Sequence, residues 1–324
     1  MRVVSLLPSA TEMVYALGVE PVGVSHECDY PPEAGELPTV IDSCVDANGS
    51  SGEIDQAVLD AVEDGGVYEI DRDTLARLDP DIVVSQGICD VCAVDDSEVR
   101  AAVEELELGA EVVATDPHSL ADVFADIKRL GRVLDCESRA ESVVADLEAR
   151  VERVRETTPD DGPDVAVLDW LDPVMVSGHW VPEMISIAGG SYELADPGDR
   201  STPREWKQIR AADPDVLIAA PCGFGLEQIE ENVTDLTARP GWNELAAVRE
   251  GRVYAMDGHH YVNRPGPRLV DTLEYLAGVV HPGTFEVPAA VAEPLYDGAT
   301  DDQTLTGSAT LNTNRTVGPT ARDN

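Results

Sequence analysis

Basic residues are scarce in this chain. Its 324 residues include 22 lysines and arginines against 63 aspartates and glutamates, a formal net charge of −41. So few cations cannot neutralise a nucleic-acid backbone, which excludes nucleic acid as a partner. The acidic residues are spread along the whole chain, and such a surface repels itself unless salt screens it. We expect a halophilic type of surface; an acidic mesophilic protein is the alternative.

We expect neither a signal peptide nor a membrane-spanning helix. Residues 1–8 enter an apolar segment directly, without the long apolar region and small-residue cleavage site of a signal peptide. No run of about 18 apolar residues predicts a transmembrane helix. We therefore expect a cytoplasmic protein, or one on the extracytoplasmic face of the membrane if an upstream start supplies a signal. Six cysteines in a chain of this length do not suggest a disulfide scaffold, so free thiols are expected.

Short apolar runs alternate with helical patterns along most of the chain, which predicts mainly parallel sheets. The first helix is expected to have Ser9 as its N-cap, with Glu12 at the third helical position completing a capping box. Residues 42–53, rich in Ser, Gly, Asn and Asp, are expected to form a loop. Strands are expected at residues 2–6, 22–24, 81–84, 111–114, 164–168, 174–176, 216–220 and 252–256.

The two halves of the chain repeat one layout. Residues 75–84 and 209–218 each read as a helix, an Asp-Pro-Asp turn and a buried strand. Between them, residues 119–157 have continuous helical periodicity, in which Gly131 either kinks one helix or separates two. We predict an α/β fold of two similar α/β lobes with parallel sheets, joined by a long backbone helix, with a ligand cleft between the lobes. The expected boundaries are 1–117 for the N-terminal lobe, 118–158 for the connecting helix, 159–283 for the C-terminal lobe and 284–324 for a disordered tail.

Histidines and cysteines gather in the loops that follow the predicted strands. Four of the six residues of each type lie there. Because the carboxyl ends of strands in open α/β sheets carry ligand sites, these loops are expected to line the cleft. The candidate ligand-binding residues are Pro8, Ser9, His26, Tyr30, Gln86, His179, Trp180, Phe224, His259 and His260.

The Cys89-x-x-Cys92 pair suits zinc, an iron–sulfur cluster or dithiol chemistry, and a pair of plain free thiols is the alternative. Cys28, with His26, would complete a thiolate metal site. Nearby aspartates would raise the thiol pKa values and oppose redox activation. Imidazole also suits cobalt, zinc and copper, which makes His179 and His259 candidate metal ligands. No P-loop, nucleophile elbow or zinc-protease motif is present, which favours a binding protein over an enzyme.

The segment Val3-Val4-Ser5-Leu6-Leu7-Pro8-Ser9-Ala10-Thr11-Glu12 resembles the opening of the helical-backbone (class III) ABC-transporter substrate-binding proteins, the vitamin B12 and ferric-siderophore receptor family. Segments 78–83 and 213–218 are similar as well, and the resemblance covers roughly residues 1–283. Segments 26–31, 89–94 and 178–183 resemble a cobalamin-binding branch. The resemblance implies two lobes on a rigid helix, cobalamin or a related metal chelate held between them, an ABC importer permease as partner and no obligatory cofactor.

The same family places an acidic residue on each lobe to dock on the transporter. Asp73 occupies that position in the first lobe; the second has Lys207 there, with Glu205 close by. The expected function is therefore capture of a cobalamin-like corrinoid by a monomer for ABC import, with Trp180 and loop backbone against the macrocycle. The alternatives are an intracellular metal- or corrinoid-handling protein that uses Cys28, Cys89 and Cys92 as a site for zinc or another metal, and a thiol-dependent enzyme.

Overall fold

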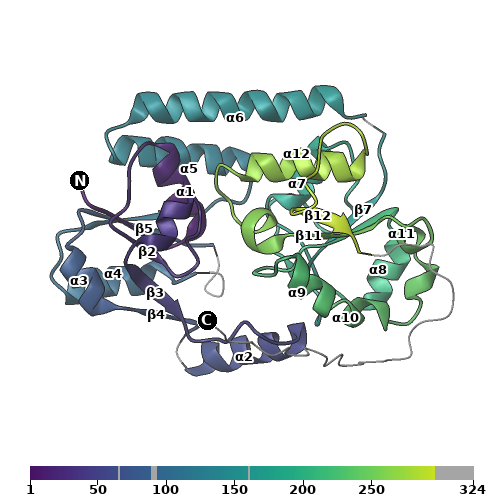
Figure 1. Ribbon diagram of the computed structural model, residues 1–324, viewed down its shortest axis with the longest axis horizontal. Helices are drawn as coiled ribbons and strands as arrows, with labels where there is room; N and C mark the ends of the chain where they lie inside the picture. The colour runs from purple at the N-terminus through teal and green to yellow at the C-terminus, as the bar shows by residue number, and fades with distance from the viewer. Residues whose placement is uncertain (65, 89–92, 160, 296–324) are drawn as a thin grey trace, which may run out of the picture.

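The computed structural model describes residues 1–64, 66–88, 93–159 and 161–295. Two α/β lobes lie side by side, and one long helix, α6, runs along both of them (Figure 1). The predicted two-lobe fold is confirmed. None of the helices in these residues is long and apolar enough to cross a membrane.

The N-terminal lobe is built on a six-stranded sheet in the order β4-β3-β2-β1-β5-β6. All neighbouring strands pair in parallel except β3 and β4. The strands are β1 Val3–Ser5, β2 Gly23–Ser25, β3 Thr39–Ser43, β4 Tyr68–Ile70, β5 Ile82–Gln86 and β6 Glu111–Thr115. The helices are α1 Pro8–Ala16, η1 Pro32–Glu36, α2 Ser51–Asp64, α3 Arg72–Leu78 and α4 Asp96–Glu105.

The C-terminal lobe has a second six-stranded sheet in the order β12-β11-β10-β7-β8-β9. Its central strands are parallel, but β8, β9 and β12 pair antiparallel, so both sheets are mixed and not purely parallel as predicted. The connection from β7 to β8 spans only residues 171–174, too short for a parallel crossover. The strands are β7 Val165–Trp170, β8 Met175–Val176, β9 Thr202–Pro203, β10 Val216–Ala219, β11 Val253–Met256 and β12 Ala292–Pro294. The helices are α7 Val181–Ile187, α8 Trp206–Ala212, α9 Leu226–Glu231, α10 Thr234–Thr237, η2 Trp242–Glu244, α11 Ala246–Arg249, η3 Gly258–Val262 and α12 Leu269–Val280.

The connecting region is two helices, α5 Leu120–Val133 and α6 Glu137–Thr157, and not one. The chain reverses through Asp135, which has a φ of 55°. Gly131 is needed for close packing of the two helices, because a Cβ there would lie 2.4 Å from the Cβ of Ala140. The start of α6 is tied to lobe one by Arg139, whose Nε donates to the Ala16 carbonyl over 2.9 Å. Further along, Arg150 bonds Glu274 of α12, so α6 spans the junction of the lobes.

Helix α1 begins at Pro8 with Leu7 as its N-cap, and no side chain caps it, so the predicted capping box is wrong. Proline is well suited to the first helical position because its φ is fixed and it has no N–H to satisfy. Ser9 is therefore already inside the helix and buried. Glu12 is free to bond elsewhere, and it does so across the lobe junction.

Residues 42–53 are not a continuous loop: β3 extends to Ser43 and α2 begins at Ser51. Helix α2 lies on the opposite side of the molecule from α6 (Figure 1). Its backbone N–H at Ser51 donates to Asn232 Oδ1 over 3.0 Å, and Ile54 belongs to the apolar core of lobe two. Helix α2, which lies between β3 and β4 of lobe one in the sequence, thus packs on lobe two.

The chain beyond residue 283 is ordered further than predicted. Strand β12 pairs with β11, and the Leu295 N–H donates to the Val253 carbonyl over 2.9 Å. The last part of the predicted tail, residues 296–324, lies outside the described residues.

Candidate functional site

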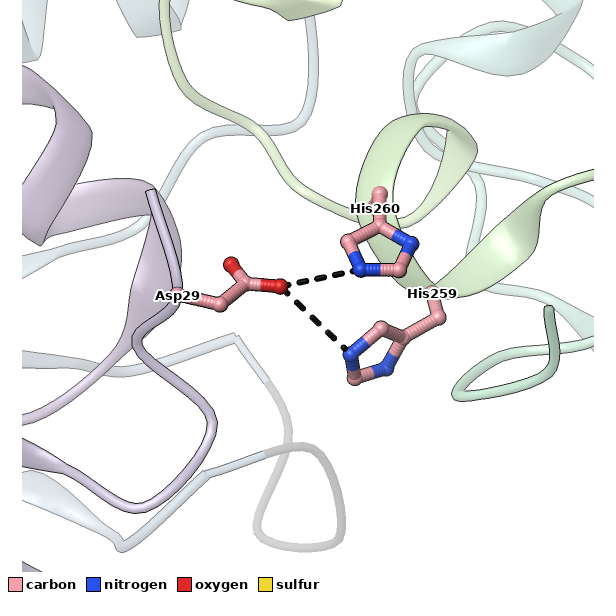
Figure 2. A group of neighbouring side chains, drawn as sticks. All are labelled: Asp29, His259 and His260. Atoms are coloured by element: carbon pink, nitrogen blue, oxygen red, sulfur yellow. Dashed lines mark ion pairs between the residues drawn. The ribbon is translucent and has the colours of Figure 1, made fainter. Parts of the chain in front are cut away.

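Two loops from different lobes meet at the junction. The first follows β2 and carries Asp29, and the second is η3, which follows β11 and carries His259 and His260. Figure 2 shows the Asp29 carboxylate facing both imidazole rings. Asp29 Oδ2 lies 2.9 Å from His260 Nε2 and 3.9 Å from His259 Nε2. Both loops leave the carboxyl ends of parallel strands, the edge where α/β sheets carry ligand sites.

Asp257 fixes the ring of His260. Its Oδ2 lies 2.7 Å from His260 Nδ1, and its Oδ1 accepts the His260 backbone N–H over 2.6 Å. Hydrogen bonds to Asp257 and then to Asp29 raise the pKa of His260 to about 9. At neutral pH His260 is therefore an imidazolium that links a carboxylate of each lobe.

Arg264, whose side chain is only 6% exposed, completes the cluster by bonding Asp29 Oδ1. Its Nη2 lies 3.1 Å from His259 Nε2 and 3.3 Å from the Glu27 carbonyl. Burial opposes the charge on Asp29, but hydrogen bonds from His260 and Arg264 outweigh it and hold the Asp29 pKa well below its usual range. Burial, and next the Arg264 charge, lower the pKa of His259.

A second cross-lobe ion pair lies nearby. Arg268 Nη2 donates to Glu12 Oε1 over 2.6 Å, and the Glu12 side chain is only 2% exposed. Burial raises the pKa of Glu12, while Arg268 opposes that rise. The guanidinium also lies 4.1 Å from the ring centroid of Tyr30 and 5.4 Å from that of Tyr261. Two of the chain's few cations are thus placed at the lobe junction.

His179 and Trp180 immediately precede α7, and Trp180 contacts η3, the helix that carries His259 and His260. His179 Nδ1 is 3.3 Å from His118 Nδ1, and the two rings stack. Burial is the largest cause that lowers the pKa of His179. Trp180 is 5% exposed and belongs to the apolar core, and its indole N–H donates to the Val262 carbonyl over 2.9 Å. Little of its ring is therefore available to a flat macrocycle in this conformation.

The other predicted ligand residues are dispersed over the two lobes. His26 is exposed, and its Nδ1 lies 3.1 Å from the Ile41 carbonyl. Phe224 is 2% exposed and packs edge-on against Trp170, with ring centroids 5.0 Å apart. Tyr30, 47% exposed, reaches the junction through Arg268. The remaining three are Pro8, the first residue of α1, Ser9, 3% exposed, and Gln86, 5% exposed at the end of β5.

The predicted thiolate site is described only in part. Cys28 is 2% exposed and lies 3.1 Å from Thr11 Oγ1. Burial raises the pKa of its thiol, which keeps it neutral and less reactive. Cys89 and Cys92 lie outside the described residues, so the three-cysteine site stays a prediction. The four cysteines that the structure does describe are free.

Both proposed docking residues are exposed and lie at equivalent helix starts. Asp73 is in the first turn of α3, and Glu205 is the N-cap of α8. Glu205 forms an ion pair with Lys207, the residue that stands where the family pattern expects an acid. Asp73 also lines a hollow of about 450 Å³ at the outer edge of lobe one, together with Asp42, Glu69, Ile70, Asp71 and Arg72.

The sequence reasoning missed five residues that build the junction: Glu12, Asp29, Asp257, Arg264 and Arg268. Four of them lie beside predicted residues, in or next to the loops 25–31 and 257–265. The available signal was the presence of opposite charges in those two loops. Which acid meets which base depends on the orientation of the lobes, which sequence spacing does not give.

Known proteins with similar sequences and structures are extracytoplasmic binding proteins. An uncharacterised ABC transporter substrate-binding lipoprotein of Bacillus subtilis is 26% identical over 301 residues, 88% of this chain and 81% of that protein. The vitamin B12-binding protein of Vibrio cholerae is 23% identical over 84% of this chain and 86% of its own length. Its crystal structure superimposes with a TM-score of 0.63 at 22% identity, covering 86% of this chain and 96% of that one. A periplasmic heme-binding protein of Pseudomonas aeruginosa gives a TM-score of 0.66 at 20% identity, covering 90% and 96%. The sequence model of the periplasmic binding protein family matches residues 3–259, and the chain belongs to that family.

Proposed function

We propose that this protein captures a cobalamin-like corrinoid, or a related metal chelate, between its two lobes and presents it to an ABC importer at the extracytoplasmic face of the membrane. The observation that carries the proposal is the junction itself. Asp29, His259, His260 and Arg264 bring two lobes together at the carboxyl ends of their strands. The vitamin B12- and heme-binding proteins among the similar structures support a flat metal chelate as the ligand.

The residues around the cluster suit such a ligand. Tyr30 and Tyr261 offer aromatic faces, which pack well on a macrocycle. Arg264 and Arg268 offer hydrogen-bond donors to carboxylate, amide or phosphate groups at its edge. These arginines also have partners of their own in lobe one, so ligand entry would exchange cross-lobe ion pairs for ligand contacts.

Equilibrium dialysis of the purified chain against cobalamin, heme and a ferric siderophore tests the proposal. We expect cobalamin to bind at one molecule per chain. Tyr30→Ala should weaken binding at least tenfold, while Tyr68→Ala, a tyrosine on edge strand β4, should not. Failure of the wild-type chain to bind any tetrapyrrole would overturn this function.

Presentation to a transporter is tested separately. We propose that Asp73 and Glu205 dock on cationic residues of a permease, because both are exposed at equivalent helix starts of the two lobes. Charge reversal by Asp73→Lys or Glu205→Lys should reduce uptake in a reconstituted system and leave cobalamin binding unchanged. Glu141→Lys, which reverses an exposed charge on α6, is the matched control and should change neither.

A further inference from the structure

The Asp29, His259 and His260 side chains present three ligating atoms that lie within 4.8 Å of one another. We propose that these three residues bind one divalent transition-metal ion, of the zinc type, directly between the lobes. This inference goes beyond the proposed function, because the ion would bind as such and not as the centre of a captured chelate.

The spacing of the donor atoms fits a metal of this size. Zinc binds imidazole nitrogen and carboxylate oxygen at about 2.0–2.2 Å, so donors around a tetrahedral ion lie roughly 3.4 Å apart. Asp29 Oδ2 lies 2.9 Å from His260 Nε2 and 3.9 Å from His259 Nε2, on either side of that value. Figure 2 shows the carboxylate and both rings converging on the same space.

Neighbouring residues orient the proposed ligands through hydrogen bonds, as is usual around protein-bound metals. Asp257 bonds His260 Nδ1 at 2.7 Å and so keeps Nε2 directed at the site, as in a carboxylate–histidine–metal arrangement. The ion would replace the Nε2 proton that His260 otherwise donates to Asp29, and that proton would be released to solvent. Arg264 bonds Oδ1 of Asp29 and leaves Oδ2 for the ion. The same arginine also contacts His259 Nε2, but the Glu27 carbonyl, 3.3 Å from Nη2, gives it another acceptor when His259 turns to a metal.

The donor set also indicates which ions would bind. Two imidazoles and one carboxylate suit zinc, cobalt or nickel, whereas magnesium and calcium prefer sites made of oxygen alone. Three protein ligands leave one position of a tetrahedral ion open. Since Asp29 belongs to lobe one and both histidines to lobe two, the ion would hold the lobes together.

Isothermal titration of the full chain with zinc chloride, after removal of metal by a chelator, tests the site. The titration is done in a Cys89→Ser/Cys92→Ser background, so that the Cys-x-x-Cys pair does not bind zinc. We expect one zinc ion per chain, no binding of magnesium and a rise in the melting temperature with zinc. His260→Ala and Asp29→Asn should each weaken zinc binding more than tenfold.

Two further variants keep the test informative if a ligand variant unfolds. Asp257→Asn retains all three ligands and should weaken zinc binding about 10- to 100-fold, the usual cost of losing a residue that orients a ligand. His118→Ala removes a histidine of the other imidazole pair and should leave zinc binding unchanged. Circular dichroism on each variant verifies the fold.

Absence of stoichiometric zinc binding in the Cys89→Ser/Cys92→Ser background would overturn the site, and so would binding that survives a folded His259→Ala/His260→Ala variant. Loss of zinc with His118→Ala alone would place the ion elsewhere and overturn it as well. Cobalamin dialysis of the metal-free chain is scored independently. Cobalamin binding without zinc binding refutes only the metal site, and the reverse refutes only chelate capture.

Discussion

Asp79 and Asp213 occupy the same position in the two lobes: each ends a helix in the left-handed conformation, with φ of 41° and 42°. Each is followed by Pro-Asp and a central strand. The carboxylate two residues later closes the turn in both lobes, since Asp81 Oδ2 accepts the Arg2 N–H over 2.6 Å and Asp215 Oδ2 accepts the Asp164 N–H over 3.0 Å. The two Asp-Pro-Asp segments therefore share the same backbone conformation and the same type of hydrogen bond, as well as the same sequence.

Replacing Asp79 or Asp213 with glycine should affect the free energy of unfolding differently. Glycine adopts the left-handed conformation without strain. We therefore expect Asp79→Gly to raise the free energy of unfolding by up to about 1 kcal/mol. Asp213 also accepts the Ala246 N–H through Oδ1 over 2.8 Å, so Asp213→Gly loses that bond. It should be less stable than Asp79→Gly by about 1 kcal/mol in urea unfolding. Equal stability of the two variants would contradict this account.

Much of the fold was predictable because it depends on local pattern. The Asp-Pro-Asp turns and the apolar runs after them predict buried strands, and the structure confirms β5 and β10 as fully buried strands. Ser9 shows where local pattern fails: it matches a capping box, yet Pro8 before it takes the first helical position. Helix α2 was missed because its stability comes from packing Ile54 on lobe two, a contact far away in sequence.

The candidate site was predictable in part. His259 and His260 follow a strand, and their place at the strand end follows from α/β topology. Asp29 was not among the predicted site residues, although it lies in the same loop as His26 and Cys28. In the structure His26 turns toward Ile41, while Asp29 meets the other lobe. Which residue of a polar loop faces a partner lobe depends on tertiary orientation and not on residue type.

Ile54 and Leu59 on α2 provide a test of the contact between this helix and lobe two. Ile54 is 7% exposed within the core of lobe two, and Leu59 is 53% exposed. Ile54→Ala should lower the free energy of unfolding by about 2 kcal/mol, because it leaves a cavity. Leu59→Ala should change it by less than about 0.5 kcal/mol. Urea unfolding at constant m-value measures both, and similar losses would mean that α2 does not pack on lobe two.

Asp169, at the end of β7, should make stability fall as pH rises. Its Oδ1 is buried and has no hydrogen-bond partner among the described residues, and burial raises its pKa to about 6. Because the folded pKa lies above the unfolded value, the native state binds the extra proton between about pH 4 and 6, and stability declines over that window. Relative to Asp169→Asn, the wild type should lose roughly 3 kcal/mol from pH 4 to 7, at about 1.4 kcal/mol per pKa unit. A constant difference between the two proteins across this range would refute the assignment.

The net charge of −41 predicts strong salt dependence. Screening shortens the Debye length from about 10 Å at 0.1 M to about 3 Å at 1 M, which weakens repulsion between surface carboxylates. The melting temperature should therefore rise steadily with potassium chloride over this range and follow the same curve with sodium chloride. A melting temperature that does not change with either salt would mean that the surface charges are not limiting.

Arg268 should be far more important for stability than an arginine in a surface ion pair. Its partner Glu12 is 2% exposed, so Arg268→Met leaves a buried carboxylate without a cation, at a cost of about 3–5 kcal/mol. Arg72 pairs with Glu105, 66% exposed, and Arg72→Met should cost less than about 1 kcal/mol. Urea unfolding of both variants compares the two pairs. The double variant Glu12→Gln/Arg268→Met should recover part of the loss, because the buried negative charge is then removed together with its partner. If the double variant is no more stable than Arg268→Met alone, the loss comes from the Tyr30 and Tyr261 contacts of Arg268 and not from the unpaired carboxylate.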